Sequence, residues 1–426
     1  MLIFVDQISE RLIYIKEFIF DSHGIIGDLT NDKNYFQSYD GEKCIFSDIS
    51  LDGIPTLKPS ALLFEEKLGH KWNIQLEKWN ELECFSFDGI VDPLASIFYV
   101  LSRFEEYGLI IKDEHDRFSA KMSLQYKHNL LQRQIVEEWI ELFVKTYSPS
   151  QLELLEKNKT VTFIPTFDID NTFAFKWKEG WRSWLSNCKD FFNNQPNRRV
   201  LRKKVQKGLE QDPFDCYDYL ESIANQFPET HFFWLVGDFA QYDKNITLTD
   251  PRHQKLIRKF DAIAKVGLHP SYASNLNFRK LELEKERLET VLNRTIETSR
   301  QHFLKLNFPN TYESNRKLKF TTDFTMGYAD EVGFRAGTAR KHYFFDLIHN
   351  DRTNYEIVPF VYMDGTLNEY KRFSIDEALQ CVDELIVEVE KYGGVFCCLW
   401  HNESIAEAGK WKGWRGVFEH TIEQFK

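Results

Sequence analysis

The chain has 426 residues and a mass of 50.6 kDa, which is enough for two or three domains. Its 42% hydrophobic and 28% charged residues are typical of a folded chain surrounded by water. The formal net charge of −11 argues against a general nucleic-acid binder and against docking on an anionic membrane, because both functions need a basic face.

The N-terminal stretch Met1–Phe18 contains an early aspartate, Asp6, and no long apolar core, so it does not have the pattern of a signal peptide. Nowhere does the sequence reach the roughly 18 consecutive apolar residues of a membrane helix. The seven cysteines are an odd number at no metal-knuckle spacing, and Cys397 and Cys398 are neighbours in an apolar run, which predicts buried free thiols. We therefore expect a cytoplasmic protein without a membrane span.

Residues 1–150 alternate between short apolar runs and turn signals, which predicts an N-terminal α+β module. One helix is expected to begin at Pro93 with Asp92 as its N-cap, and a second helix is expected over Leu130–Val144. This part has no cluster of catalytic residue types, so we assign it no chemistry. The polar segment Ser148–Thr160 is expected to link it to the rest of the chain.

The stretch after this link ends in two carboxylates. Val161–Ile164 is an apolar, β-branched run typical of a buried strand, and Asp168 and Asp170 follow it. Residues two apart on an extended backbone point to the same side, so both carboxylates should project together. Such a pair either shares a cation or keeps its two pKa values apart. The alternative is a polar strand end in which Asp170 starts a turn through Asn171.

Residues 151–426 continue as alternating strand and helix patterns, which predict repeated β/α units and a parallel sheet, open or closed into a barrel. Helices are expected over Arg279–Ile296 and Ile375–Tyr392. The basic, aromatic stretch Trp177–Gln211 is expected to be a solvated helical insertion. The further strand candidates are His231–Val236, Ala264–His269, Lys319–Asp323, Gly333–Arg335, Ile357–Val361 and Val395–His401.

Four of these runs lead to residues that can do chemistry: His269, Arg335, Asp364 and His401. The carboxyl ends of parallel strands meet at one edge of a sheet, where β/α folds place their active sites. Alone, a histidine after an apolar run is more often a hydrogen-bonded core residue than a ligand. Together with the aspartate pair, the four residues favour one shared site.

Several of these strand ends form recognisable motifs. They are TFDID at Thr166–Asp170, GLHPSY around His269, GFRAGT around Arg335, MDGT around Asp364 and LWH ending at His401. In this set the chain resembles the polysaccharide deacetylases, the NodB-like carbohydrate esterases of family 4, and more narrowly their divergent Bacteroidetes-type members with an extra N-terminal module. The resemblance covers Val161–His401 and implies a distorted (β/α) barrel of the NodB type for residues 151–426.

The resemblance also implies a role for each matched residue. Asp168 would be the general base, and Arg335 would orient it. Asp170 and His269 would bind one divalent metal ion. His401 would be the general acid that protonates the leaving amine.

Other residues of this part are expected to support the site. Asp364 can bond the second ring nitrogen of His401 and keep the imidazole protonated. Asp323 follows a predicted strand and is expected to touch substrate. Tyr272 and Trp400 are expected to offer stacking surfaces for a sugar ring, with simple packing in the core as the alternative.

The chain departs from the family pattern at one metal ligand. The family supplies a second histidine four residues after the first, and this chain has Ala273 four residues after His269. We expect His302, in the segment Ser299–Leu304, to be the substitute ligand. The alternative is that Arg300 and His302 form only a polar connection between a helix and a strand.

The expected function is that of a metal-dependent hydrolase that removes an N-acyl group, most simply acetyl, from an amino sugar or a sugar conjugate. Zinc is the expected ion, with nickel, cobalt and manganese as alternatives. The partner would be an N-acetylated sugar or a nucleotide- or lipid-linked precursor, and the sequence carries no signal for an oligomeric state. The alternatives are a related C–N hydrolase acting on a non-sugar amide, and an inactive binding or scaffold protein, which the missing histidine favours.

Overall fold

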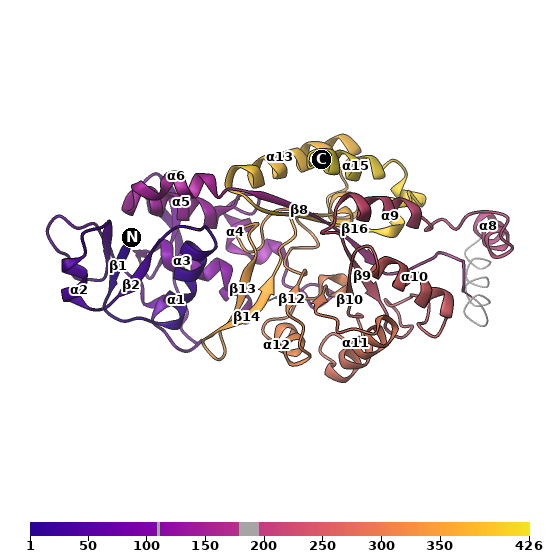
Figure 1. Cartoon of the computed structure of the whole chain (residues 1–426), viewed down its shortest axis with the longest axis horizontal. Helices are drawn as coiled ribbons and strands as arrows, with labels where there is room; N and C mark the ends of the chain where they lie inside the picture. Colours follow the sequence, from indigo (N-terminus) through magenta and orange to yellow (C-terminus); the bar gives the residue numbers. More distant parts are fainter. Residues whose placement is uncertain (109–110, 179–195) are drawn as a thin grey trace. The chain divides into compact units, whose positions relative to one another are not determined.

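The computed structural model describes residues 1–108, 111–178 and 196–426 (Figure 1). It has a curled sheet of nine strands and an N-terminal α+β part, so the predicted fold class, a distorted (β/α) barrel with an N-terminal α+β module, is confirmed. Of the predicted insertion, residues 179–195 lie outside the described residues, and Pro196–Gln206 form helix α8.

The strands are short, and most of them alternate with helices along the chain. They are β1 (Leu2–Val5), β2 (Asp28–Thr30), β3 (Lys43–Phe46), β4 (Thr56–Leu57), β5 (Ile74–Trp79), β6 (Leu82–Phe87), β7 (Ile90–Val91), β8 (Val161–Ile169), β9 (His231–Leu235), β10 (Lys265–His269), β11 (Thr298–Ser299), β12 (Thr322–Asp323), β13 (His342–Asp346), β14 (Asp351–Ile357), β15 (Tyr362–Met363) and β16 (Gly394–His401).

The described α-helices are α1 (Glu10–Lys16), α2 (Lys33–Ser38), α3 (Pro93–Leu101), α4 (Leu124–Lys127), α5 (Ile135–Tyr147), α6 (Leu152–Lys157), α8 (Pro196–Gln206), α9 (Tyr217–Gln226), α10 (Pro251–Asp261), α11 (Phe278–Leu292), α12 (Asn310–Lys317), α13 (Ile375–Tyr392), α14 (Asn402–Ile405) and α15 (Arg415–Glu423). Short 3-10 or π turns are η1 (Glu17–Asp21), η2 (Ala61–Leu63), η3 (Phe104–Tyr107), η4 (Ala120–Met122), η5 (Pro149–Gln151), η6 (His302–Leu304), η7 (Thr366–Tyr370) and η8 (Gly409–Trp411).

The nine-stranded sheet has the order β13-β14-β12-β11-β10-β9-β8-β16-β15. The pairs β8–β9, β9–β10, β10–β11 and β15–β16 are parallel. Asp168 is in register with Phe233, and His269 is in register with Leu235. The carboxyl ends of β8, β9 and β10 therefore lie at the same edge of the sheet.

The local signals explain most of these elements. The side chain of Asp92 accepts a hydrogen bond from the backbone N–H of Ala95 and caps α3, as predicted. Helix α13 has the predicted bounds Ile375–Tyr392. The strand β8 is buried from Phe163 to Ile169, as expected for a central parallel strand covered on both faces.

Three predicted strands differ from the structure. Of Lys319–Asp323, only Thr322–Asp323 is a strand, because Lys319 follows α12 with a φ of 62°. Gly333–Arg335 is a turn, in which Gly333 has a φ of 112° and the N–H of Gly337 donates to the carbonyl of Phe334 at 2.9 Å. A Cβ atom at Gly333 would lie 2.4 Å from a backbone carbonyl oxygen, so this close approach requires glycine. The predicted strand Ile357–Val361 is also interrupted, because β14 ends at Ile357 and Pro359 has no N–H for a ladder.

The N-terminal part contains two smaller sheets. One is parallel with the order β2-β1-β3-β4, and the other is antiparallel with the order β5-β6-β7. Helix α5 buries Ile135, Trp139 and Phe143 in the core of this part, which is the apolar face predicted from their spacing.

The chain folds as two compact units, each built from several segments. The first unit comprises Met1–Thr162, Leu306–Val361 and Glu384–Phe396, and the second comprises Phe163–Lys305, Tyr362–Asp383 and Cys397–Lys426. The division of the chain near residue 150 into two domains stays a prediction.

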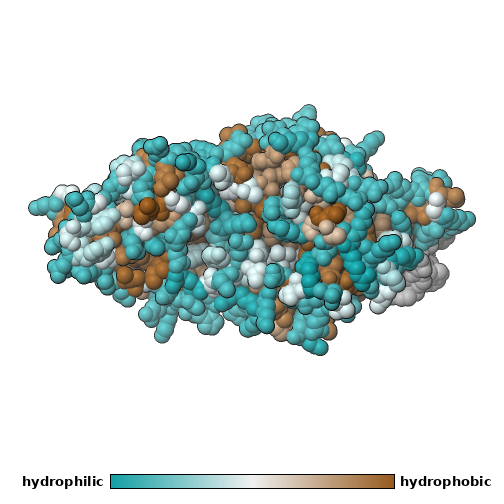
Figure 2. Space-filling view, viewed as in Figure 1, coloured by the Kyte–Doolittle hydropathy of each residue, from teal (hydrophilic) through white to brown (hydrophobic). Residues whose placement is uncertain are grey.

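The hydropathy of the surface and the burial of the cysteine side chains are typical of a folded chain. On the face shown in Figure 2, hydrophilic side chains predominate and hydrophobic ones form small separate groups. Among the described helices, none combines the length and apolar character needed to cross a membrane. The described cysteines are free, and Cys397 and Cys398 are buried as predicted; Cys188 lies outside the described residues.

A buried ionic network joins segments of the first unit that are far apart in sequence. Arg335 donates from Nε to Glu106 Oε1 at 3.0 Å, and Arg103 donates from Nε to the same oxygen at 2.8 Å. Arg103 also donates to Glu105 at 2.9 Å, so two guanidinium groups face two carboxylates. Burial opposes ionisation of Glu106, but Arg335 and Arg103 outweigh it and hold the pKa of Glu106 below its usual range.

We predict that Arg335→Gln lowers the free energy of unfolding by about 3–5 kcal/mol, because it leaves a net negative charge in a buried network. Urea unfolding measures the change. The control is Arg287→Gln, which removes an ion pair with Asp238 whose side chains are 38% and 78% exposed and should cost about 0–1 kcal/mol. A loss at Arg335 no larger than that of the control would contradict the prediction.

Candidate functional site

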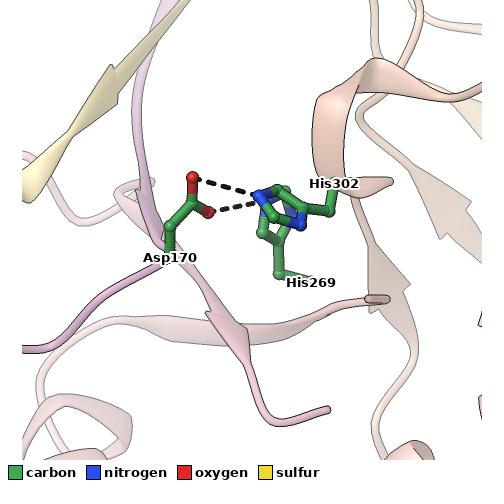
Figure 3. A group of neighbouring side chains, drawn as sticks. All are labelled: Asp170, His269 and His302. Carbon is green, nitrogen blue, oxygen red and sulfur yellow. Dashed lines mark ion pairs between the residues drawn. The ribbon is translucent and has the colours of Figure 1, made fainter. Parts of the chain in front are cut away.

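Three of the predicted site residues lie close together in the second unit. Asp170 directly follows β8, His269 is the last residue of β10, and His302 begins η6 shortly after β11. In Figure 3 the carboxylate of Asp170 points toward the two imidazoles. One ligand atom from each residue lies within 4.8 Å of the other two. The three side chains therefore converge as three potential ligands.

The nearest atoms of the three residues are Lewis bases. Asp170 Oδ1 is 3.0 Å from Nε2 of His269, and Asp170 Oδ2 is 3.3 Å from Nε2 of His302. Both imidazoles are buried, whereas the side chain of Asp170 is 32% exposed. A small molecule can therefore approach the group from the side of Asp170.

Hydrogen bonds fix the tautomer of each imidazole. Nδ1 of His269 is 2.6 Å from the backbone oxygen of Arg300, and Nδ1 of His302 is 3.0 Å from Oδ1 of Asp243. A carbonyl and a carboxylate can only accept, so both Nδ1 atoms carry hydrogen. The lone pairs of the two Nε2 atoms therefore face the carboxylate of Asp170, unless a proton or a cation lies between them.

The donor set fits a divalent metal ion. One carboxylate and two imidazoles are ligands that zinc and similar ions accept, and they leave further coordination positions open. Oδ1 of Asp170 is enclosed and accepts no hydrogen bond with good geometry in the described part of the chain. The Nδ1–H group of each imidazole donates a hydrogen bond to an acceptor, which is the usual arrangement for histidines that bind a metal ion. These residues can hold one metal ion.

In the metal-free protein, protons take the place of the cation. Burial by itself lowers the pKa of His302, but the carboxylates of Asp170 and Asp243 outweigh it and raise the pKa to about 9. Burial likewise opposes ionisation of Asp170, but the two imidazoles hold its pKa well below the usual range. Binding of a metal ion must displace such a proton.

The carboxylate of Asp168 lies beside the three potential ligands. Its Oδ2 atom is 3.6 Å from Nε2 of His269, and its Oδ1 atom accepts a hydrogen bond from Nη1 of Arg300 at 3.1 Å. The same Nη1 atom donates to Thr166 at 2.7 Å, and the guanidinium stacks 4.6 Å from the ring centroid of Phe233. Arg300 is fully buried and places a fixed positive charge against Asp168.

The arginine that contacts Asp168 is therefore Arg300, where the sequence led us to expect Arg335. The guanidinium of Arg335 bonds Glu106 and the carbonyl of Gly327 at 2.9 Å within the first unit. The turn at Gly333 explains the difference, because Arg335 does not end a strand as predicted.

His401 forms a second polar group with Asp364 in the same unit. Nδ1 of His401 is 2.9 Å from Oδ1 of Asp364, and Ser404 donates from Oγ to Oδ2 of the same carboxylate. Nε2 of His401 is 3.7 Å from Oδ2 of Asp170. Burial lowers the pKa of His401, but Asp364 and then Asp170 outweigh it and raise the pKa well above the usual range. These carboxylates therefore favour the imidazolium form of His401.

Two of the predicted substrate contacts are enclosed. Trp400 is fully buried, and its Nε1 atom donates to the hydroxyl of Tyr362 at 3.2 Å, so no face of the indole is open for stacking. Asp323 is fully buried in the first unit, where it accepts hydrogen bonds from Tyr312 and Thr325. Both side chains have the contacts of core residues.

Tyr272 is the predicted substrate contact that keeps partial exposure. Its ring centroid is 4.5 Å from that of Tyr242 and 5.3 Å from that of Phe303. The ammonium of Lys305 lies 4.5 Å from the same ring. These side chains form an aromatic cluster beside His302, whose ring centroid is 4.8 Å from that of Phe303.

Arg300, Asp243 and Ser404 take part in this site, but the sequence analysis assigned them no role in it. Arg300 and His302 are two residues apart after a short strand, which is the same spacing as that of Asp168 and Asp170. This repeated spacing could have predicted that Arg300 and His302 point to the same side. Asp243 lies in a segment between β9 and α10 that has no helical or strand periodicity, so it carried no such signal.

Comparison with protein families identifies only the N-terminal part. Residues 1–148 match a family of unknown function (DUF7033). No curated protein matches the chain.

Several solved structures are partly similar to this chain. One is a protein from Mycobacterium smegmatis assigned as a polysaccharide deacetylase, with 14% sequence identity and a TM-score of 0.40. The match covers 63% of this chain and 84% of that chain. Puue allantoinase matches with 10% identity, 62% and 83% coverage and a TM-score of 0.39. A protein from Pseudomonas aeruginosa PAO1 assigned as a polysaccharide deacetylase matches with 8% identity, 62% and 84% coverage and a TM-score of 0.38.

We predict that the ring of His302 remains an imidazolium up to about pH 9 in the metal-free protein. The control is His253, whose burial lowers its pKa to about 4 and whose Nε2 accepts from the indole N–H of Trp234 at 3.1 Å. Nitrogen-15 NMR of the ring nitrogens distinguishes the two states, with His302 charged and His253 neutral at pH 7. A neutral His302 ring at pH 7 would contradict the prediction.

The same shift has a consequence for stability. The folded-state pKa of His302 lies above the unfolded value of about 6.5. Its ion pairs therefore stabilise the metal-free protein fully below that value, and the contribution is lost as the pH rises through about 9. Urea unfolding of the metal-free protein at several pH values checks the sign.

Proposed function

We propose that the protein is a metal-dependent amide hydrolase that removes an N-acyl group, most simply acetyl, from an amino sugar or a sugar conjugate. The observation that carries the proposal is the position of a further carboxylate, Asp168, and a further imidazole, His401, beside one candidate metal centre. Asp168 lies 3.6 Å from His269, and His401 lies 3.7 Å from Asp170. A site that only binds a ligand has no need for a base and an acid together.

Asp170, His269 and His302 would hold the ion, and zinc is the ion that this donor set suits best. When bound, the ion supplies Lewis acidity toward the acyl carbonyl and lowers the pKa of a nearby water molecule. The partial exposure of Asp170 leaves a side on which water and the amide can enter.

Asp168 would accept the proton of the attacking water. The buried guanidinium of Arg300 donates a hydrogen bond to Oδ1 of this carboxylate at 3.1 Å. The hydrogen bond from Arg300 and the stacking of Arg300 on Phe233 also keep the carboxylate in one orientation.

His401 would donate a proton to the departing amine when the tetrahedral intermediate collapses. Its Nδ1–H group is held by Asp364, so Nε2–H points away from that carboxylate and toward the edge where Asp170 lies. Ser404 holds the second oxygen of Asp364 and fixes the pair. The proposed base and the proposed acid are therefore separate residues, held by separate partners.

The metal centre predicts a stoichiometry. The wild-type chain should bind about one zinc ion, and Asp170→Asn, His269→Ala and His302→Ala should each bind zinc much more weakly. Metal content after dialysis and competition with a chromophoric chelator measure the loss. The control is His420→Ala, a partly exposed histidine paired with Asp383, and this variant should bind zinc like wild type. Wild type that stays metal-free with added zinc would refute the proposal, and unchanged affinity of His302→Ala would remove His302 from the ligand set.

The acid–base assignment predicts activity. A panel of N-acetylated amino sugars and their conjugates, assayed by release of free amine, should contain a substrate of the zinc-loaded protein. Asp168→Asn and His401→Gln should lower kcat/KM by about 10²–10⁴ while zinc remains bound. His420→Gln is the matched control for the His401 variant. Bound zinc without hydrolysis of any sugar or simple amide would favour the binding-protein alternative.

A further inference from the structure

Asp243 lies outside the candidate ligand set, yet its carboxylate accepts three hydrogen bonds beside it. The residue is 1% exposed. Oδ1 accepts hydrogen bonds from the N–H of Tyr272 at 2.8 Å and from Nδ1–H of His302 at 3.0 Å, and Oδ2 accepts from the N–H of Ala273 at 3.1 Å. One buried carboxylate thus holds both an imidazole and a backbone loop.

The loop in question is the one that follows His269. It contains Ala273, whose side chain cannot bind a metal ion. Asp243 therefore binds the backbone of this loop and, with the same carboxylate, binds His302.

The two imidazoles of the centre have different partners. Nδ1–H of His269 donates to the neutral backbone carbonyl of Arg300, whereas Nδ1–H of His302 donates to a carboxylate. A carboxylate partner fixes the ring and makes the opposite ring nitrogen a stronger donor toward a metal ion than a carbonyl partner does. Asp243 contacts Nδ1, so it lies across the ring from Nε2 and does not itself occupy the ligand position.

We propose that Asp243 is the positioning residue that makes His302 a metal ligand in this centre. It holds the imidazole in the Nδ1–H tautomer, directs Nε2 toward Asp170 and ties this ring to the loop after His269. The inference rests on the proposed metal centre and adds to it the residue on which the substitute ligand depends.

A purely structural role for Asp243 would have different consequences. The chain offers a matched carboxylate for comparison, because Glu284 is also buried and accepts hydrogen bonds from the N–H of Ser271 at 2.9 Å and from its hydroxyl at 2.5 Å. Glu284 holds the same loop through Ser271, a residue without an imidazole. Loss of loop support alone should therefore affect Glu284 and Asp243 variants alike.

The experiment is a competition titration of the full chain with zinc at pH 7.5, using a chromophoric chelator. Asp243→Asn keeps the shape of the side chain and should weaken zinc binding by about 10–100-fold. Glu284→Gln should bind zinc like wild type. In the His302→Ala background, Asp243→Asn should cause no further loss, because its effect passes through His302.

A spectroscopic measurement separates positioning from stability. With cobalt in place of zinc, the visible absorption bands of Asp243→Asn should shift from those of wild type, and those of Glu284→Gln should not. Equal weakening by the Asp243 and Glu284 variants, an equal Asp243 effect with and without His302, or wild-type affinity of Asp243→Asn would each overturn the inference. Failure of the wild type to bind zinc would instead refute the proposed metal centre itself.

Discussion

The convergence of lone pairs from Asp170, His269 and His302 is the interaction on which the rest of the candidate site depends. The Nε2 atoms of His269 and His302 lie 3.0 and 3.3 Å from the carboxylate oxygens of Asp170. The Nδ1 atom of each imidazole already donates a hydrogen bond to another acceptor. Such an arrangement is unfavourable unless a positive charge lies among the lone pairs. The surrounding hydrogen bonds thus hold the three groups in position for a cation, although their lone pairs repel one another when none is bound.

Two extended segments meet at this point with the same spacing of residues. Asp168 and Asp170 lie two apart at the end of β8, and Arg300 and His302 lie two apart after β11. The inner members, Asp168 and Arg300, form a buried ion pair, and the outer members, Asp170 and His302, face each other, with only Asp170 partly exposed. One pair can therefore fix a carboxylate while the other contributes two potential metal ligands. The alternation of side chains along extended backbone produces both pairs at once.

The GFRAGT motif has a different setting, in the first unit. Its arginine, Arg335, shares Glu106 with Arg103, and its glycines allow a turn in which other backbone approaches closely. Removing four charged groups from water is costly, and the cost is offset only while all of them stay paired. Arg335 thus joins distant segments of one unit, because its partner Glu106 lies 229 positions away in the sequence.

Local patterns in the sequence were sufficient for the α/β class, the capped start of α3, the bounds of α13 and the common direction of Asp168 and Asp170. These features depend on neighbours a few residues away, and helix and strand periods express them directly. The turn at Gly333 and the break at Pro359 were missed because apolar residues around them imitate strands. Only the tertiary structure decided that Arg300 faces Asp168 and that Asp243 holds His302. Those partners are 132 and 59 positions apart, and their contact depends on the register and crossover of separate strands, which no local pattern specifies.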